Sequence, residues 1–107
     1  MSLKTKPKEP SNIIAVGVKR DDAKRLSEWE ELGAVFCAIQ NMYLTANAYG
    51  VGCYLSTGGI TNFDEAKTFF GLGSDDTLRG FMHLGMPKGN VPDGRRRPIA
   101  KKVKWGL

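Results

Sequence analysis

The sequence predicts a small α+β domain in which one long helix packs on a small mixed sheet. Apolar side chains recur at three- and four-residue steps over residues 28–49, and three shorter segments have apolar patterns typical of strands. With 107 residues, 41% of them hydrophobic and 25% charged, the chain has room for one globular domain. We expect residues 1–11 to form a flexible arm or an expression remnant, and residues 12–107 to form the domain.

The first predicted strand covers residues 12–18, with the sequence NIIAVGV. In an extended chain its β-branched side chains fall on both faces. Such a run is typical of a strand in the middle of a layered sheet, where both faces are covered. We therefore expect this segment to lie inside the sheet, ahead of a charged turn.

The strongest local signal is a helix from Glu28 to Tyr49. Ser27 and Glu30 form a capping-box pattern at its start, and Gly50 stands where a helix end favours the left-handed conformation. One face is apolar and a second face carries compact side chains: Leu32, Val35, Phe36, Ile39, Met42, Tyr43, Ala46 and Tyr49 on the first, Ala34, Ala38, Asn41, Thr45 and Ala48 on the second. A chain of this size can hardly cover such a helix, so we expect burial in an assembly, most simply a dimer.

The second half of the chain holds two more strands and a short helix. Residues 51–55 predict a strand that runs into a loop of small residues, Ser56-Thr57-Gly58-Gly59, whose backbone can lie against a ligand. Asn62 and Glu65 form a second capping-box pattern, which predicts a short helix that stops near residue 71. Alternating side chains over residues 77–86 predict the last strand, followed by a loop and a basic tail.

Positive charge is concentrated in that tail. Residues 88–107 hold seven basic residues and one acid, whereas residues 1–87 hold nine basic and ten acidic residues. A basic tail can bind phosphate on nucleic acid, on lipid or on a small cofactor. Its one aromatic residue, Trp105, and its prolines and glycines argue against nucleic acid as the partner.

The sequence lacks the usual catalytic sets. It contains no GxSxG, Walker or GxGxxG motif, and its lone histidine, His83, is expected to have a structural role in a strand rather than to bind metal. Cys37 is expected in the core, and Cys53 as a buried, inert thiol. Two cysteines favour a reduced, cytoplasmic setting, and no apolar run approaches the roughly 18 residues of a membrane span. If the protein is an enzyme, a cofactor is expected to carry the reaction.

Four pieces of sequence stand in an order that resembles a known family. They are CAIQNMYLTANAYGVGCY in the long helix and the strand after it, the loop STGG, the strand LRGFMHLGMPKG, and the basic motif RRRP. Together they resemble the C-terminal half of the FMN-dependent nitroreductase family, which shows a QN pair in a helix, a small-residue flavin loop, a strand ending in a glycine and a proline, and a late "R.P" motif. The resemblance covers about residues 12–105, nearly the whole chain.

The resemblance implies a fold, a cofactor and a reaction. Nitroreductases are α+β homodimers with interlocked subunits, in which the long helix packs in the dimer core and the C-terminal tail reaches over the partner. One FMN lies in each of two interface pockets. The flavin takes a hydride from NAD(P)H and passes electrons to a nitroaromatic, a quinone or a similar small acceptor in a ping-pong cycle, while the protein supplies binding and electrostatics.

The resemblance also implies which residues bind FMN. Ser56, Thr57, Gly58 and Gly59 would lie along the isoalloxazine ring, with a backbone amide of one of the two glycines donating to the flavin N5. Arg96 matches the family's tail arginine on the FMN phosphate, with Arg95 as a neighbouring candidate, because a guanidinium meets phosphate oxygens in pairs. The family often has a lysine two residues before this arginine, where this chain has Gly94.

The start of the chain departs from the family. Nitroreductases begin with an arginine and serine cluster that holds the phosphate, and nothing in residues 1–11 resembles it. We therefore expect the second half of a nitroreductase, either a truncated gene product or an expressed fragment. The alternative is a non-catalytic dimerisation module whose basic tail binds nucleic acid or another protein; a steep salt dependence of nucleic-acid retention would favour it.

Overall fold

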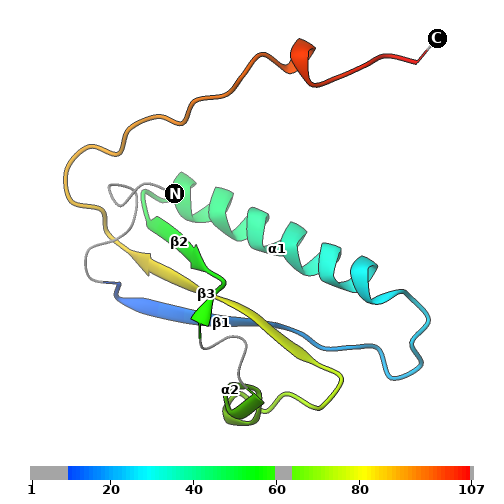
Figure 1. Ribbon diagram of the computed structural model, residues 1–107. Coiled ribbons are helices and arrows are strands. Elements are labelled where there is room, and N and C mark those ends of the chain that lie inside the picture. Colours follow the sequence, from blue (N-terminus) through cyan, green and yellow to red (C-terminus); the bar gives the residue numbers. More distant parts are fainter. Residues whose placement is uncertain (1–9, 60–63, 107) are drawn as a thin grey trace.

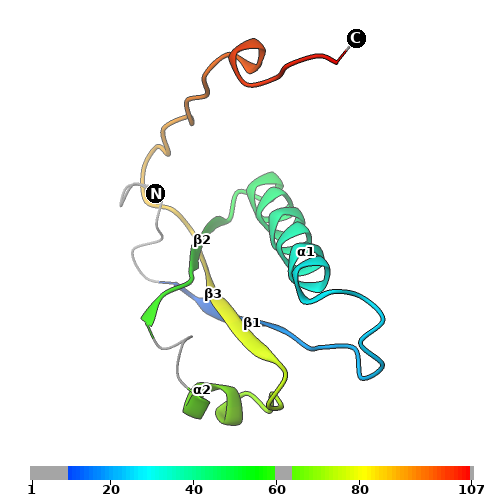
Figure 2. The same cartoon turned by 45° about the vertical axis from the view of Figure 1, so that its right-hand side comes forward.

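A three-stranded sheet with one long helix across it forms the centre of the computed structural model, which describes residues 10–59 and 64–106 (Figure 1). The chain order is β1 (Asn12–Val18), α1 (Glu28–Ala48), β2 (Gly52–Ser56), α2 (Asp64–Phe69), β3 (Thr77–Gly85) and a short 3-10 helix, η3 (Ile99–Lys101). The expected α+β class, with one long helix on a small sheet, is confirmed. In the view of Figure 2, α1 lies above the sheet and α2 lies below it.

The three strands lie in the order β1-β3-β2, and β3 runs antiparallel to both neighbours. β1 and β2 therefore run in the same direction with β3 inserted between them. Both described pairings are antiparallel, so the expectation of a mixed sheet was wrong for this part of the chain. The chain crosses from β1 through α1 to β2 and leaves one strand position open, which β3 then fills.

β1 lies at an edge of this sheet, not in its middle as its sequence pattern led us to expect. Ile13 is 57% exposed and Ile14 37%, and only the last residue, Val18, is buried. The β-branched run indicates a strand, but which strands pair depends on contacts with residues 59 to 72 positions away. The prediction of a strand over residues 12–18 is confirmed, and the prediction that both its faces are covered is wrong.

The two ends of α1 are built differently. Ser27 is the N-cap residue, but its side chain makes no capping hydrogen bond; its carbonyl accepts instead from the backbone N–H groups of Glu30 and Glu31, at 3.1 and 3.2 Å. The predicted capping box is therefore not formed. At the other end Gly50 has φ +73°, and the Val51 N–H reaches back to the Ala46 carbonyl at 2.9 Å. This 6→1 bond closes the helix as the glycine predicted.

One stripe of α1 packs on the sheet and the rest stays uncovered. Ile39 is buried, whereas Trp29 is 72% exposed, Leu44 59% and Tyr49 80%. Cys37 is exposed, so the expectation of a core cysteine was wrong. Three short strands span only one side of a 21-residue helix. No helix in the described residues is long and apolar enough to cross a membrane.

The core lies on both faces of the sheet, with α1 packed on one of them (Figure 2). Its buried apolar residues are Val18, Ile39, Ala66, Leu78 and Met82, and the Met82 side chain is fully enclosed. α2 covers part of the opposite face, where the rings of Phe70 and Phe81 lie 5.7 Å apart. Asn62, the predicted cap of α2, lies outside the described residues.

A carboxylate fixes the turn that precedes β3. The Asp76 side chain accepts from the backbone N–H of Gly73 at 2.8 Å and from that of Arg20 at 2.9 Å. These two bonds lower the pKa of Asp76, because they stabilise the charged carboxylate. The turn after α2 is thereby tied to the residues that follow β1.

Candidate functional site

The small-residue loop begins at the last residue of β2. Ser56 ends the strand and lies opposite Phe81 of β3. One residue earlier, the Leu55 N–H donates to the Tyr43 hydroxyl at 2.6 Å, which ties the strand to α1. Burial raises the pKa of this hydroxyl. The loop at residues 57–59 thus starts from a strand end held on one side by β3 and on the other by the helix.

The loop backbone itself is exposed and sterically open. A Cβ built on Gly58 or on Gly59 would meet no atom within 4 Å. Gly59 has φ +66°, a conformation that side-chain-bearing residues rarely adopt. Thr57, Gly58 and Gly59 are all exposed. A flat ligand can therefore approach the main chain here without meeting side chains from either glycine.

Gly80 of β3 permits a close approach beneath the start of this loop. A Cβ at Gly80 would lie 2.8 Å from the Ser56 carbonyl oxygen, 2.9 Å from Leu55 Cδ1 and 3.5 Å from Thr57 Cγ2. Our sequence analysis missed both Gly80 and Tyr43 as parts of the site. A signal for the glycine was present, because an isolated glycine inside a strand pattern often marks a close backbone approach.

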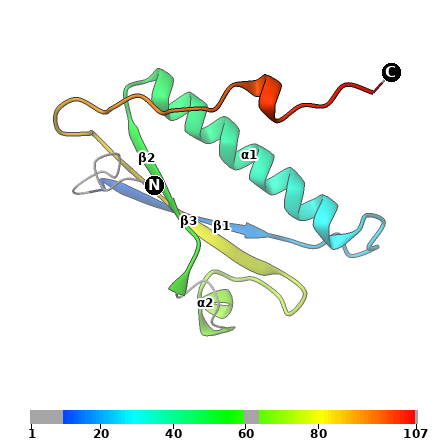
Figure 3. The same ribbon diagram turned by 45° about the horizontal axis from the view of Figure 1, so that its top comes forward.

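The two predicted phosphate-binding arginines lie in the basic arm, which we define as residues 88–106. Arg95 and Arg96 are both exposed, and Arg96 Nη1 donates to the Arg95 carbonyl at 3.2 Å. The arm leaves β3 after Gly85 and extends away from the sheet; in the view of Figure 3 it passes across α1 (Figures 1 and 3). Both guanidinium groups are thus in a solvent-exposed segment.

The structure does not bring the loop and the arginines together. Gly85 lies opposite Gly52, the first residue of β2, whereas the loop follows Ser56 at the other end of that strand. A five-residue strand separates its ends by about 13 Å, at roughly 3.3 Å per residue. The arm thus begins at the opposite end of β2 from the loop. The binding assignments of residues 56–59, Arg95 and Arg96 therefore stay predictions.

His83 of β3 and Cys53 of β2 belong to neighbouring residue pairs of the sheet. His83 lies opposite Tyr54, with ring centroids 5.9 Å apart, and Cys53 lies opposite Leu84. Burial raises the pKa of the half-buried Cys53 thiol, which disfavours the reactive thiolate. Among the described residues no group of three or more histidine, cysteine and acidic side chains could hold a metal ion.

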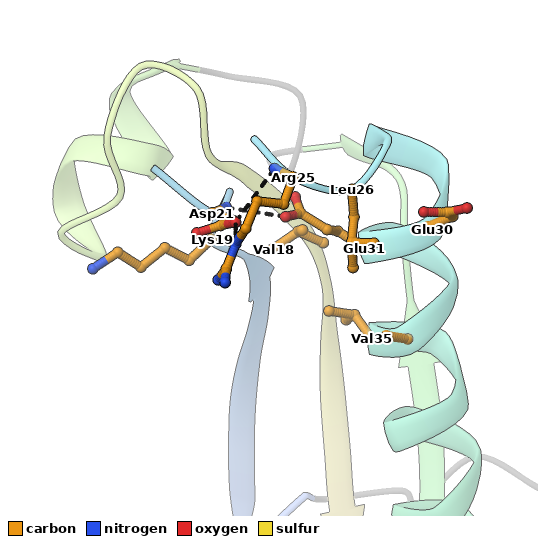
Figure 4. A pocket seen from close by; sticks show the side chains of 9 residues that line it. Val18, Lys19, Asp21, Arg25, Leu26, Glu30, Glu31 and Val35 are labelled. Carbon is orange, nitrogen blue, oxygen red and sulfur yellow. Dashed lines mark hydrogen bonds and ion pairs between the residues drawn. The ribbon is translucent and has the colours of Figure 1, made fainter. Parts of the chain in front are cut away.

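A hollow of about 650 Å³ lies between the end of β1 and the first turns of α1 (Figure 4). Asp21 accepts from Arg25 Nε at 2.8 Å, and this guanidinium lowers the pKa of the carboxyl. The Asp21 backbone N–H donates to Glu31 Oε1, and Glu31 also pairs with Arg20 at 3.1 Å. Arg20 Nη1 and Glu31 Oε2 are buried and make no hydrogen bond, so the ion pair is the contact that balances their charges. The lining includes neither the loop residues nor the two arginines. We assign this hollow no ligand.

Comparison with known proteins identifies the same family as the sequence resemblance. The family model described as "Nitroreductase family" matches residues 5–86. A curated protein of Escherichia coli (strain K12), "Putative NAD(P)H nitroreductase YdjA", is 31% identical over 87 residues, which cover 76% of this chain and 48% of that protein. The same protein from Escherichia coli O157:H7 matches equally. The chain spans about half the length of the curated relatives it matches.

A solved structure supports the fold. The crystal structure of a nitroreductase-like family protein from Bacillus cereus is similar to this chain with a TM-score of 0.70 and 26% sequence identity. The similarity covers 86% of this chain and 49% of the other. The family-model match includes β1 to β3 and the loop, but it ends before Arg95 and Arg96.

Proposed function

The chain belongs to the nitroreductase family, and we propose that it contributes the flavin loop and the phosphate-binding arm of an FMN-dependent NAD(P)H oxidoreductase. The observation that carries the proposal is the open, glycine-containing loop at residues 56–59, held at the end of β2 within the range that matches the family. When bound, FMN would supply the redox chemistry: it accepts a hydride from NAD(P)H and reduces a nitroaromatic, a quinone or a similar small acceptor.

The loop has the properties that a flavin ring requires. A planar ring needs a backbone surface without protruding side chains, and Gly58 and Gly59 leave that space free. A backbone amide of either glycine would donate to the flavin N5, a bond that stabilises the reduced ring. Ser56 and Thr57 would line the ring edge. Because the strand end is fixed, these donors would already be in position, and no reorganisation free energy would be needed to place them at each turnover.

The arginines have the properties that a phosphate requires. Arg95 and Arg96 are exposed in the basic arm, and a guanidinium binds phosphate through paired donors. In the proposed enzyme the arm closes on the same FMN that the loop holds. The separation between arm and loop is consistent with a site that assembles only in a homodimer, where the arm reaches over the partner. We place this enzyme in the cytoplasm, where NAD(P)H is available.

The visible absorption spectrum of the purified protein tests the proposal. The protein is read between about 350 and 500 nm before and after addition of FMN and desalting, and the molar mass of the flavin-containing fraction is measured by light scattering. Retained flavin bands in a dimeric fraction, bleached by NAD(P)H, are the expected result. A colourless protein that retains no FMN would contradict the proposal for this chain.

The phosphate role has its own matched control. Arg96→Ala is expected to weaken FMN binding, and riboflavin, which lacks the phosphate, should bind the variant and the unmodified protein equally. Arg97→Ala removes the same charge one residue further along the arm. Equal losses in both variants would mean that the arm acts through general positive charge, not through a phosphate contact at Arg96.

The exposed basic arm also supports the alternative, a dimerisation module that binds nucleic acid or another protein. This function predicts retention on DNA or RNA that falls steeply with salt, because each neutralised phosphate releases a counterion. Retention that is weak even at low salt would argue against it. Flavin binding and salt-dependent retention are independent measurements, so the two functions can be separated in one preparation.

A further inference from the structure

We propose that Gly80 is a positioning residue for the flavin loop, an inference that rests on the proposed function. Gly80 lies in β3, between the bulged residue Arg79 and Phe81, and is buried. The last pair of the register joins Ser56 to Phe81, and a Cβ at Gly80 would lie 3.5 Å from Cγ2 of Thr57, the next residue. The residue without a side chain therefore lies beside Thr57, where the loop leaves β2.

The distances show what the missing side chain permits. A Cβ at Gly80 would lie 2.8 Å from the Ser56 carbonyl oxygen and 2.9 Å from Leu55 Cδ1. Ordinary contacts of a Cβ begin at 3.4 Å, so the oxygen would have to move by about 0.6 Å. The leucine side chain can rotate away, but the oxygen belongs to the main chain. Its displacement moves the peptide that leads directly into Thr57 and the two glycines.

The expected chemical consequence is a shift of the N5 donor. Catalytic and binding groups tolerate little displacement, and about 1 Å of misplacement can cost on the order of a hundredfold in activity. For the smaller movement at Ser56 we expect Gly80→Ala to raise the Kd for FMN about tenfold. A displaced N5 donor stabilises reduced flavin less, so the midpoint potential of bound FMN should fall.

A second strand glycine provides the matched control. A Cβ at Gly17 of β1 would lie 3.1 Å from both Leu72 Cδ1 and the Thr77 carbonyl oxygen. Gly17→Ala therefore strains the sheet at the turn before β3, away from the loop. We expect both variants to lower the unfolding midpoint, but only Gly80→Ala to change FMN affinity, the flavin absorption maximum and the midpoint potential. Equal flavin properties in the two variants would overturn the proposal.

Amide spectra of the flavin-free protein separate failure of this proposal from failure of the proposed function. In Gly80→Ala the amide shifts should change most at residues 55–59; changes no larger there than in Gly17→Ala would overturn the positioning role even if FMN does not bind. If Gly80→Ala does not fold, the unmodified protein provides the test. A nuclear Overhauser contact between the Gly80 Hα and the Leu55 methyl groups is expected, and its absence would overturn the proposal.

Discussion

Replacing Tyr43 with phenylalanine is expected to loosen the edge of the sheet from which the loop at residues 56–59 starts. β2 is an edge strand among the described strands, and the Leu55 N–H donates to the Tyr43 hydroxyl at 2.6 Å instead of to another strand. Tyr43→Phe keeps the ring in contact with the sheet but removes this acceptor. The change therefore isolates one hydrogen bond between α1 and β2.

The magnitude follows from the surroundings of that bond. A hydrogen bond of this kind contributes about 0.5–1.5 kcal/mol, and a buried N–H left unpaired costs about 1–3 kcal/mol. Leu55 and Tyr43 are only half-buried, so water can reach part of the site. We expect the free energy of unfolding to fall by about 1 kcal/mol, which lowers the melting temperature of a domain of this size by roughly 4–8 °C.

Urea unfolding followed by circular dichroism measures the effect, with Tyr49→Phe as the control. Tyr49 lies at the C-terminal end of the same helix and is 80% exposed, so its hydroxyl should be dispensable. The urea slope should be unchanged in both variants, because neither alters the surface exposed on unfolding. Equal midpoints for the two variants would refute the structural role of the Tyr43 hydroxyl.

The pH dependence provides a second test of the same residue. Burial raises the pKa of Tyr43 above its unfolded value of 10.0, so the folded state retains this proton to higher pH. The stability that depends on the neutral hydroxyl is fully present below about pH 10 and is lost as pH rises through the folded pKa. The stability difference between the unmodified protein and Tyr43→Phe should therefore shrink above pH 10. A constant difference would contradict the assignment.

Three further predictions concern the core, the turn before β3 and the thiols. Met82→Ala, which empties a fully enclosed position, should cost about 3 kcal/mol in unfolding free energy, and Met86→Ala, at a 70% exposed position, close to nothing; equal costs would contradict the assigned core. Asp76, whose pKa is lowered, should lose its contribution to stability as pH falls through the folded value, so thermal melts of Asp76→Asn should depend less on acid than those of the unmodified protein. The exposed Cys37 should react with a thiol reagent at pH 8 faster than Cys53, because burial raises the pKa of the Cys53 thiol. Mass spectrometry of the labelled peptides measures the two rates, and faster labelling of Cys53 would contradict the assigned burial.

The secondary structure was predictable because its signals are local. The helical period over residues 28–49 and the glycine at position 50 gave α1 to within one residue of its observed end, and the three strands lie within one residue of the expected ranges. Local patterns carry this information because side chains three or four residues apart share a helix face. The open loop at residues 56–59 was predictable for the same reason, since its glycines determine its conformation.

The pairing of elements was not predictable, because it depends on distant residues. β1 carries the pattern of a central strand but lies at an edge, since β3 occupies the position between β1 and β2. Cys37 fits a helix that is apolar all round, yet the sheet covers only one stripe of α1. The close approach at Gly80 depends on the register between β2 and β3, which no segment of sequence specifies alone.

The uncovered helix and the divided site have one explanation in the proposed dimer. Trp29, Leu44 and Tyr49 on α1 remain exposed, and the basic arm begins at the opposite end of β2 from the loop at residues 56–59. A second copy seated on α1 would bury the first set, and an arm that reaches over the partner would approach a loop. A Trp29→Glu variant should then lose the dimer and FMN together, whereas a monomer that keeps FMN would show that one chain closes its own site.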